Sequence, residues 1–237
     1  MLRLLFMSPT RGVIQEAWGM YKAHLVHFAS IAAVIWIPVS ILQTLLSETG
    51  ALLAVILGSI VSTIGLFLVQ AALVKAVQDV RDGRADLTIG QTFSAATPYL
   101  ARVTGAGLLA GLGIAVGLFL LIVPGLILLT WWLLVAPAIV VENKGAMESF
   151  GRSRDLVRGY GWEVFGIIVL TYVVLIVVSL LIGFALVPLD DTVAAFISNL
   201  ISGIAISPFV TVAWTILYFR LADAKSGVDP AAPPPTV

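Results

Sequence analysis

The sequence predicts an all-α integral membrane protein, with six transmembrane helices arranged as three hairpins, each preceded by a cytoplasmic amphipathic helix. Three observations predict this fold class. Of the 237 residues, 60% are hydrophobic and only 11% are charged, whereas soluble domains average about 45–50% apolar and about 25% charged. Long stretches carry no charged side chain at all. All thirteen basic residues fall on one side of the topology that these stretches define.

The lengths of the uncharged stretches predict where the membrane spans lie. A spanning helix needs about 20 apolar residues to cross about 30 Å of hydrocarbon. The stretch 103–141 is too long for one span, and Val123-Pro124-Gly125 is a turn signal inside it. We therefore interpret this stretch as two helices. The six expected spans cover approximately residues 23–46, 51–74, 103–123, 126–141, 164–188 and 193–219.

The basic residues predict the orientation of these spans, because Lys and Arg concentrate in cytoplasmic loops. With six spans, the two termini and the loops after the second and fourth spans share one side. That side holds all thirteen Lys and Arg, whereas the opposite loops at 47–50, 124–125 and 189–191 hold none. We therefore expect a multi-pass protein of the inner (cytoplasmic) membrane with both termini in the cytoplasm.

The domain organisation is expected to be a single six-helix domain over residues 1–225, followed by a Pro-rich disordered cytoplasmic tail over 226–237. A threefold internal repeat is predicted when Gly12, Gly90 and Gly145 are set in register, because each then begins an amphipathic helix that precedes two spans. The alternative is that any juxtamembrane helix shows such a pattern. The three pseudo-repeats cover approximately residues 8–80, 88–141 and 143–220.

The second of these amphipathic helices carries its own start signal. Thr88 and Gln91 have the spacing of a capping box, in which each side chain accepts a hydrogen bond from the backbone N–H of the other residue. Pro98 is expected to restart the helix, because proline fits the first turn of a helix.

A charged segment after the fourth span is the main candidate for a binding role. Glu142 lies at the cytoplasmic boundary, and Arg152, Ser153 and Arg154 follow about three turns later. In the functional interpretation, these residues contact a lipid headgroup, because the planar guanidinium matches phosphate. In the structural interpretation, which we favour, Glu142 pairs with one arginine and fixes the third amphipathic helix.

The third span is rich in glycine, with Gly107 and Gly111 four residues apart and Gly113 and Gly117 likewise. Small residues at this spacing let helices approach closely. We expect them to pack helices within the chain, with dimerisation as the alternative.

Two prolines are candidate hinges. Pro137 near the end of the fourth span predicts a kink or an early exit from the membrane. Pro208 predicts a kink in the sixth span that frees a backbone carbonyl, which a neighbouring side chain then satisfies.

Few side chains are candidates for catalysis, metal binding or a polar path through the membrane. His24 and His27 are the only histidines, no cysteine is present, and no third ligand is spaced near them. The charged stretch 79–86 is interpreted as a solvated turn. Gln43, Gln70 and Asn199 are amides within spans, which more often bond neighbouring helices than line a polar path. No metal, cofactor, enzyme activity or nucleic-acid partner is expected.

One segment carries a family resemblance. It runs from Pro124-Gly125-Leu126 through Trp132, Pro137, Glu142, Gly145, Ser149-Phe150, Arg152-Ser153, Leu156-Val157, Gly159 and Trp162 to Phe165-Gly166. This pattern, with Gly12, Glu16-Ala17-Trp18, Tyr21 and Pro38, resembles the membrane domain of glycerophosphoryl diester phosphodiesterase. The resemblance implies a six-helix inner-membrane domain without the catalytic domain, and it implies Glu142, Arg152 and Ser153 only as a structural signature.

The expected function is that of a non-enzymatic module for assembly, scaffolding or regulation, in envelope or lipid homeostasis. Its expected partners are membrane lipids and either a second copy or another membrane protein. The alternative is a permease-like transmembrane subunit for a hydrophobic or lipid cargo. A polar or lipid-filled cavity between the hairpins is the feature that would favour this alternative.

Overall fold

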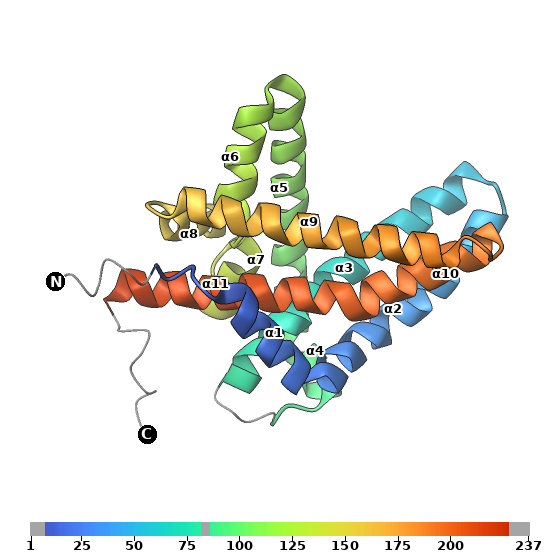
Figure 1. The fold of residues 1–237 in the computed structure, drawn as a ribbon, viewed down its shortest axis with the longest axis horizontal. Helices are drawn as coiled ribbons and strands as arrows, with labels where there is room; N and C mark the ends of the chain where they lie inside the picture. Colours follow the sequence, from blue (N-terminus) through green and yellow to red (C-terminus); the bar gives the residue numbers. More distant parts are fainter. Residues whose placement is uncertain (1–7, 82–85, 228–237) are drawn as a thin grey trace.

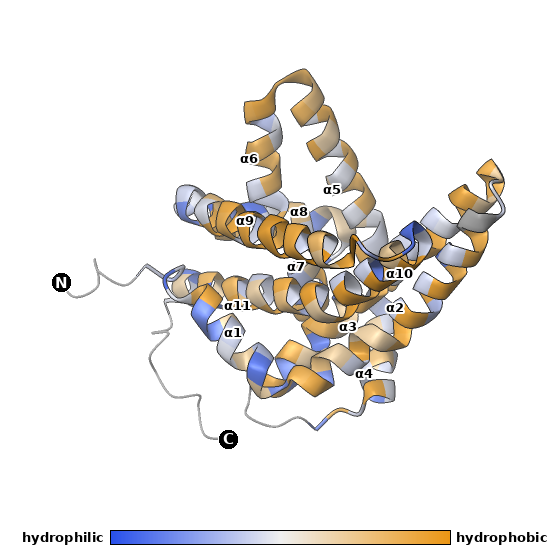
Figure 2. Ribbon diagram, turned by 45° about the vertical axis from the view of Figure 1, so that its right-hand side comes forward, coloured by the Kyte–Doolittle hydropathy of each residue, from blue (hydrophilic) through white to orange (hydrophobic). Residues whose placement is uncertain are grey.

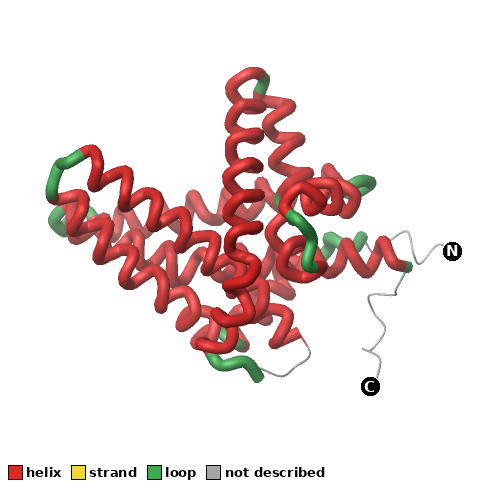
Figure 3. Tube along the Cα trace, turned by 180° about the vertical axis from the view of Figure 1, so that it is seen from behind, coloured by secondary structure: helices red, strands yellow, loops and turns green. Residues whose placement is uncertain are grey.

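The computed structural model describes residues 8–81 and 86–227, and within these ranges the chain is helical and carries no strand (Figure 3). The expected tail from residue 228 onward and the centre of the charged turn, 82–85, lie outside the described residues. The helices are α1 (Val13–Ala23), α2 (Leu25–Glu48), α3 (Leu52–Arg81), α4 (Ile89–Ala96), α5 (Leu100–Leu120), α6 (Ile122–Trp132), α7 (Val135–Glu142), α8 (Ala146–Val157), α9 (Gly161–Leu186), α10 (Asp191–Ile201) and α11 (Ser207–Ser226).

Six segments in the described part are long and apolar enough to cross a membrane, so the predicted multi-pass membrane class is confirmed. Short connections join α4 to α5, α6 to α7 and α10 to α11, so that each pair makes one long segment. The segments are Leu25–Leu46, Leu52–Arg81, Ile89–Leu120, Ile122–Glu142, Gly161–Leu186 and Asp191–Ser226.

The buried core lies at one end of the molecule, which we call the base. The base comprises α1, residues 69–81 of α3, and α4, α7, α8 and α11, together with the adjoining ends of α2, α5 and α9. Its largest fully buried side chains include Phe28, Leu73 and Leu134 from three different segments. In Figure 1 these helices lie close together around the labels α7 and α11.

Three apolar arms extend from this base (Figure 1). The arms are formed by α2 with the first half of α3, by α5 with α6, and by α9 with α10. The α5–α6 arm points away from the other two. The arms are rich in hydrophobic residues (Figure 2), and many of these side chains are exposed, including Phe119 at 91% and Phe184 at 82%. Such surfaces are stable only in an apolar solvent such as lipid.

Helix α3 is longer than a bilayer requires. At about 1.5 Å per residue, the 30 residues of α3 reach about 45 Å, compared with about 30 Å of hydrocarbon. The first half of α3 is largely exposed, whereas Val69, Leu73 and Val77 are fully buried. The second half of α3 therefore belongs to the protein core of the base, although its hydropathy resembles that of a span.

The turn within the expected third and fourth spans does not lie at residues 123–125. α5 ends at Leu120, Leu121 is extended, and α6 begins at Ile122. Pro124 lies in the first turn of α6, where its missing N–H has no intrahelical acceptor in any case. Gly125 is needed for close packing, because a Cβ there would lie 2.5 Å from the backbone N of Leu118.

The amphipathic segment before the third span begins as the sequence predicts. Thr88 and Gln91 form the capping box at the start of α4. Pro98 lies in the 3₁₀ turn Thr97–Tyr99, after which α5 begins.

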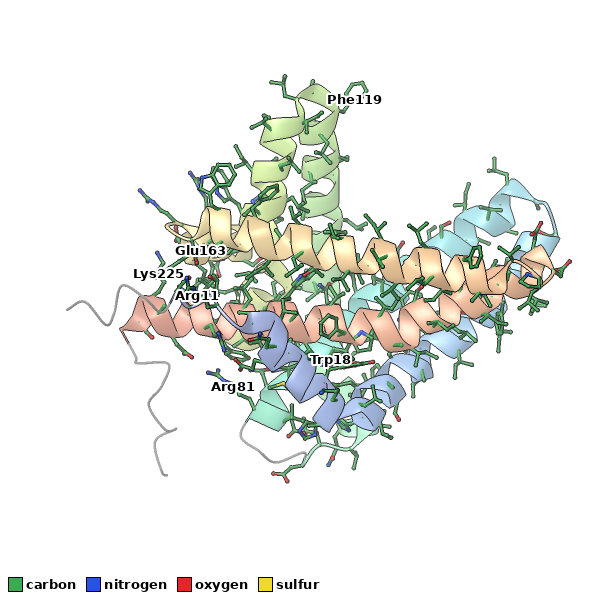
Figure 4. The ribbon with its side chains drawn as sticks, in the orientation of Figure 1. Arg11, Trp18, Arg81, Phe119, Glu163 and Lys225 are labelled. Atoms are coloured by element: carbon green, nitrogen blue, oxygen red, sulfur yellow. The ribbon has the colours of Figure 1, made fainter. Side chains whose placement is uncertain are left out.

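α1 lies against α11 and does not stand apart from the bundle. Val13, Ala17 and Tyr21, spaced four residues apart, form its buried face. Trp18 is half exposed at the edge of this contact, where its ring meets Phe209 edge-on (Figure 4). The apolar side of this helix is therefore covered by protein.

Candidate functional site

The corner between α7 and α8 brings together the charged residues that the sequence singles out. α7 ends at Glu142, and Asn143 reverses the chain in the left-handed conformation, with φ of 56°. Asparagine is one of the few residues that accept this conformation. Gly145 then precedes α8, and its backbone N–H donates to the Glu148 carboxylate at 3.2 Å.

Glu142 is the centre of this corner. Arg152 Nε donates to its two carboxylate oxygens at 2.7 and 3.0 Å, and Arg152 Nη2 lies 2.6 Å from Oε1. The hydroxyl of Tyr218 on α11 also donates to Oε1, at 2.5 Å. Lys144 Nζ lies 3.9 Å from Oε2. One carboxylate thus connects α7, α8 and α11.

This arrangement confirms that Glu142 pairs with an arginine. The hydrogen bonds that Arg152 donates to Glu142 raise the pKa of its guanidinium above the ordinary value, so Arg152 stays charged. Because the carboxylate already accepts from Arg152 and Tyr218, it is occupied by structural partners. The geometry therefore describes a connection between helices.

Ser153 closes the break between α6 and α7. Its fully buried hydroxyl donates to the carbonyl of Trp131 at 2.6 Å and accepts from the backbone N–H of Leu134 at 3.1 Å. These two groups lie where the helix is interrupted, and a helix break leaves backbone groups that need partners. The fourth span is thus broken at Leu133 and Leu134, and the kink expected at Pro137 does not lie there, because Pro137 fits within the first turn of α7.

The remaining arginines of this region are also engaged. The guanidinium of Arg154 lies over the Trp131 ring, 4.4 Å from its centroid. Arg102 on α5 donates to the carbonyls of Asn143 and Lys144, both at 3.2 Å, and to Oδ1 of Asn143 at 2.9 Å. Arg102 therefore holds the α7–α8 corner from the other side.

The four glycines of α5 have different surroundings. A Cβ on Gly107 would lie 2.1 Å from the Phe67 ring, and one on Gly113 would lie 2.5 Å from the Trp132 ring. Gly117 meets the backbone of Gly125 in α6. These three positions pack helices within the chain.

Gly111 differs from the other three, because a Cβ there would meet no atom within 4 Å. It is the one candidate packing glycine among the four that faces open space in the described structure.

The second candidate hinge, Pro208, lies in the first turn of α11, directly after the π-helical turn Ser202–Ile206. The Tyr21 hydroxyl of α1 donates to the carbonyl of Ala205, within the π-helical turn, at 2.8 Å. Burial raises the pKa of Tyr21, which keeps its hydroxyl protonated as a donor.

Ion pairs and hydrogen bonds also connect other parts of the base. Arg81 pairs with Asp223 at 2.8 Å, and Arg220 pairs with Glu16. The Ser8 and Thr10 hydroxyls donate to Glu163 at the start of α9. Figure 4 shows Arg11, Arg81, Glu163 and Lys225 gathered at this end of the molecule, far from Phe119 at the tip of an arm.

Metal-ligand geometry is not found in the described residues, since no three His, Asp or Glu side chains there group around a common point. His24 and His27 both meet the Phe28 ring edge-on. Asp79 accepts from the backbone N–H of Leu87 at 3.0 Å, on the described part of the charged turn.

Among the cavities between the described helices, two are lined by amides that the sequence analysis names. One of about 460 Å³ lies between α2, α3 and α10 near the arm tips, and its polar lining includes Gln43, Asp191 and Asn199. The other, of about 220 Å³, lies between α3, α5, α6, α7 and α11 and is lined by Gln70 and Trp214 among apolar residues. The cavities share no lining residue.

Sequence reasoning did not find Tyr218, Arg102 or Trp214 as site residues. In the sequence, Tyr218 is only an aromatic residue near the end of the sixth expected span. Its partner Glu142 lies 76 residues earlier, and no local spacing links the two. The signal available for Arg102 was that it directly follows a short helix and precedes an uncharged span.

A family model described as "Domain of unknown function (DUF7847)" matches residues 85–223, which is more than half of the chain. The matched region contains the α5–α6 arm, the Glu142 corner and α11. No curated protein and no solved structure matches the chain.

Proposed function

We propose that this chain, which belongs to the DUF7847 family, is a non-enzymatic assembly or regulatory module of the cytoplasmic membrane. The observation that carries this proposal is the division of the molecule into a closely packed base and three exposed apolar arms. The charged side chains of the candidate site contact one another within the base, which favours a structural role. The resemblance to the membrane domain of glycerophosphoryl diester phosphodiesterase stays a prediction.

In this proposal the arms are three membrane hairpins, and α1, α4 and α8 are the cytoplasmic amphipathic helices that precede them. Both termini then lie in the cytoplasm. The position of the cations supports this orientation, because Arg81, Arg220 and Lys225 contact partners in the base. The turns at the arm tips carry no Lys or Arg.

Labelling of single cysteines tests the orientation. Because the sequence contains no cysteine, each variant carries only the introduced thiol. Ala51→Cys lies in an exposed arm-tip turn, and Met147→Cys replaces a side chain on α8 that is 73% exposed. In intact cells, a membrane-impermeant maleimide is expected to label Ala51→Cys only, and to label both variants after permeabilisation. Labelling of Met147→Cys in intact cells would contradict the orientation.

The α5–α6 arm is the proposed assembly contact. It points away from the other arms, and its outer surface includes Leu108 and Leu112, which are 55% and 65% exposed. We infer that this arm packs on a second copy or on another membrane protein.

Crosslinking in native membranes tests this contact. Leu112→Cys is expected to give a covalent homodimer or a defined adduct, while Leu180→Cys, which replaces a side chain 68% exposed on α9, is the matched control and should give neither. If Leu112→Cys stays uncrosslinked, or if both variants crosslink equally, the proposed contact is wrong.

The permease-like alternative stays a prediction. The polar cavity between α2, α3 and α10 is the feature that bears on it. A cargo path through the protein would need this cavity to continue toward the base, whereas the second cavity lies among other helices and shares no residue with it. For this reason we favour the assembly function.

A further inference from the structure

The cavity between α3, α5, α6, α7 and α11 has an apolar wall toward the arms. This wall is formed by Phe67, Gly107, Gly111, Ile114 and Leu129. The free space beside Gly111 adjoins this wall, so the volume exists because α5 lacks side chains there. An apolar cavity of about 220 Å³ within spanning segments holds part of one acyl chain.

The lining of this cavity also includes two polar side chains among its apolar residues. Trp214 Nε1 is buried and has no hydrogen-bond partner within the described residues, and Trp214 and Gln70 both line the cavity. An unpaired buried N–H costs about 1–3 kcal/mol, so such a donor indicates that an acceptor is missing. The ester carbonyl of a glycerolipid is an acceptor that lies between an acyl chain and a headgroup.

Two cations lie nearer the base than Gln70. Lys75 follows Gln70 by five residues on α3, about 7.5 Å further toward the base. Its Nζ lies 4.7 Å from the centroid of the Tyr99 ring, and the Arg102 guanidinium lies 5.1 Å from the same centroid. Arg102 directly precedes Val103, which lines the cavity. Within the described part of the chain, neither cation pairs with a carboxylate.

We propose that this cavity and its two cations bind one anionic phospholipid. An acyl chain contacts the apolar wall, an ester carbonyl accepts from Trp214, and the phosphate lies by Lys75 and Arg102. This site differs from the expected headgroup contacts, because Arg152 is already paired with Glu142 and Arg154 lies over Trp131. The binding is independent of the assembly contact, and only the choice of the cytoplasmic leaflet rests on the proposed orientation.

Native mass spectrometry of the delipidated full chain in detergent tests the site. Phosphatidylglycerol and phosphatidylcholine with identical acyl chains are titrated separately. The wild type is expected to bind one phosphatidylglycerol in preference to phosphatidylcholine. Lys75→Gln should weaken phosphatidylglycerol binding about fivefold, as expected for one cation near a lipid phosphate. Gly111→Leu should weaken binding of both lipids by filling the cavity.

The matched control is Lys22→Gln. Lys22 also lies over an aromatic ring, 5.4 Å from the centroid of Trp18, but it belongs to α1, which contributes no residue to the cavity lining. Its replacement should leave binding unchanged. Equal binding of the two lipids by the wild type, an equal loss in Lys22→Gln and Lys75→Gln, or unchanged binding in Gly111→Leu would each overturn the proposal. Should Gly111→Leu not fold, Ala110→Leu is the second cavity-filling variant.

Discussion

Ser153→Ala is expected to lower the free energy of unfolding by about 2–4 kcal/mol. The Ser153 hydroxyl is the partner of both the Leu134 N–H and the Trp131 carbonyl, and the residue is fully buried. Alanine removes the hydroxyl and leaves both backbone groups at the helix break without this partner. Each buried polar group left unsatisfied costs about 1–3 kcal/mol. Equilibrium unfolding in mixed micelles, followed by far-UV circular dichroism, measures the loss.

Ser149→Ala is the matched control for this prediction. Ser149 lies one turn earlier on the same helix and is equally buried, but its hydroxyl donates only to the Ala146 carbonyl of its own helix, at 2.6 Å. Its loss should cost about 1 kcal/mol, the net contribution of an ordinary hydrogen bond. Equal destabilisation by the two variants would show that Ser153 does not hold the break between α6 and α7.

The six spans could be predicted because a membrane constrains a sequence through composition and length alone. Uncharged stretches and the one-sided basic residues need no tertiary contact to be recognised. The pairing of Glu142 with Arg152 was also predictable, since both residues lie within one short, charged segment between spans.

The base could not be predicted in the same way. The apolar side chains of α3 between residues 69 and 80 are buried in protein, and hydropathy does not distinguish a protein core from lipid. The turn at Leu121 was placed a few residues late because Pro124 suits the first turn of a helix as well as a loop. Tyr218 and Trp214 reach their sites from α11, far along the chain from α7 and α5, so no local pattern marks them.

Glu142→Ala is expected to destabilise the base by about 2–3 kcal/mol. The change leaves the Arg152 guanidinium and the Tyr218 hydroxyl without their shared acceptor, and hydrogen bonds to charged groups contribute about 1.5–3 kcal/mol each. The Glu142 and Arg152 side chains are 25% and 32% exposed, so water screens part of the loss and keeps it below the cost of breaking a fully buried pair. The same mixed-micelle unfolding measures it.

A double-mutant cycle separates the pair from its surroundings. Glu142→Gln keeps an oxygen that can accept from Tyr218 but removes the charge that Arg152 faces, so we expect it to cost about half as much as Glu142→Ala. Once Glu142 has been replaced by Gln, Arg152→Gln should cost at least about 1 kcal/mol less than it does in the wild type, because the two side chains act together. Strictly additive losses of stability would mean that the remaining contacts of the corner hold α7 and α8 together. Arg102 would then be the first residue to test. It binds the same corner through Asn143 and Lys144, and its hydrogen bonds do not involve the Glu142 carboxylate.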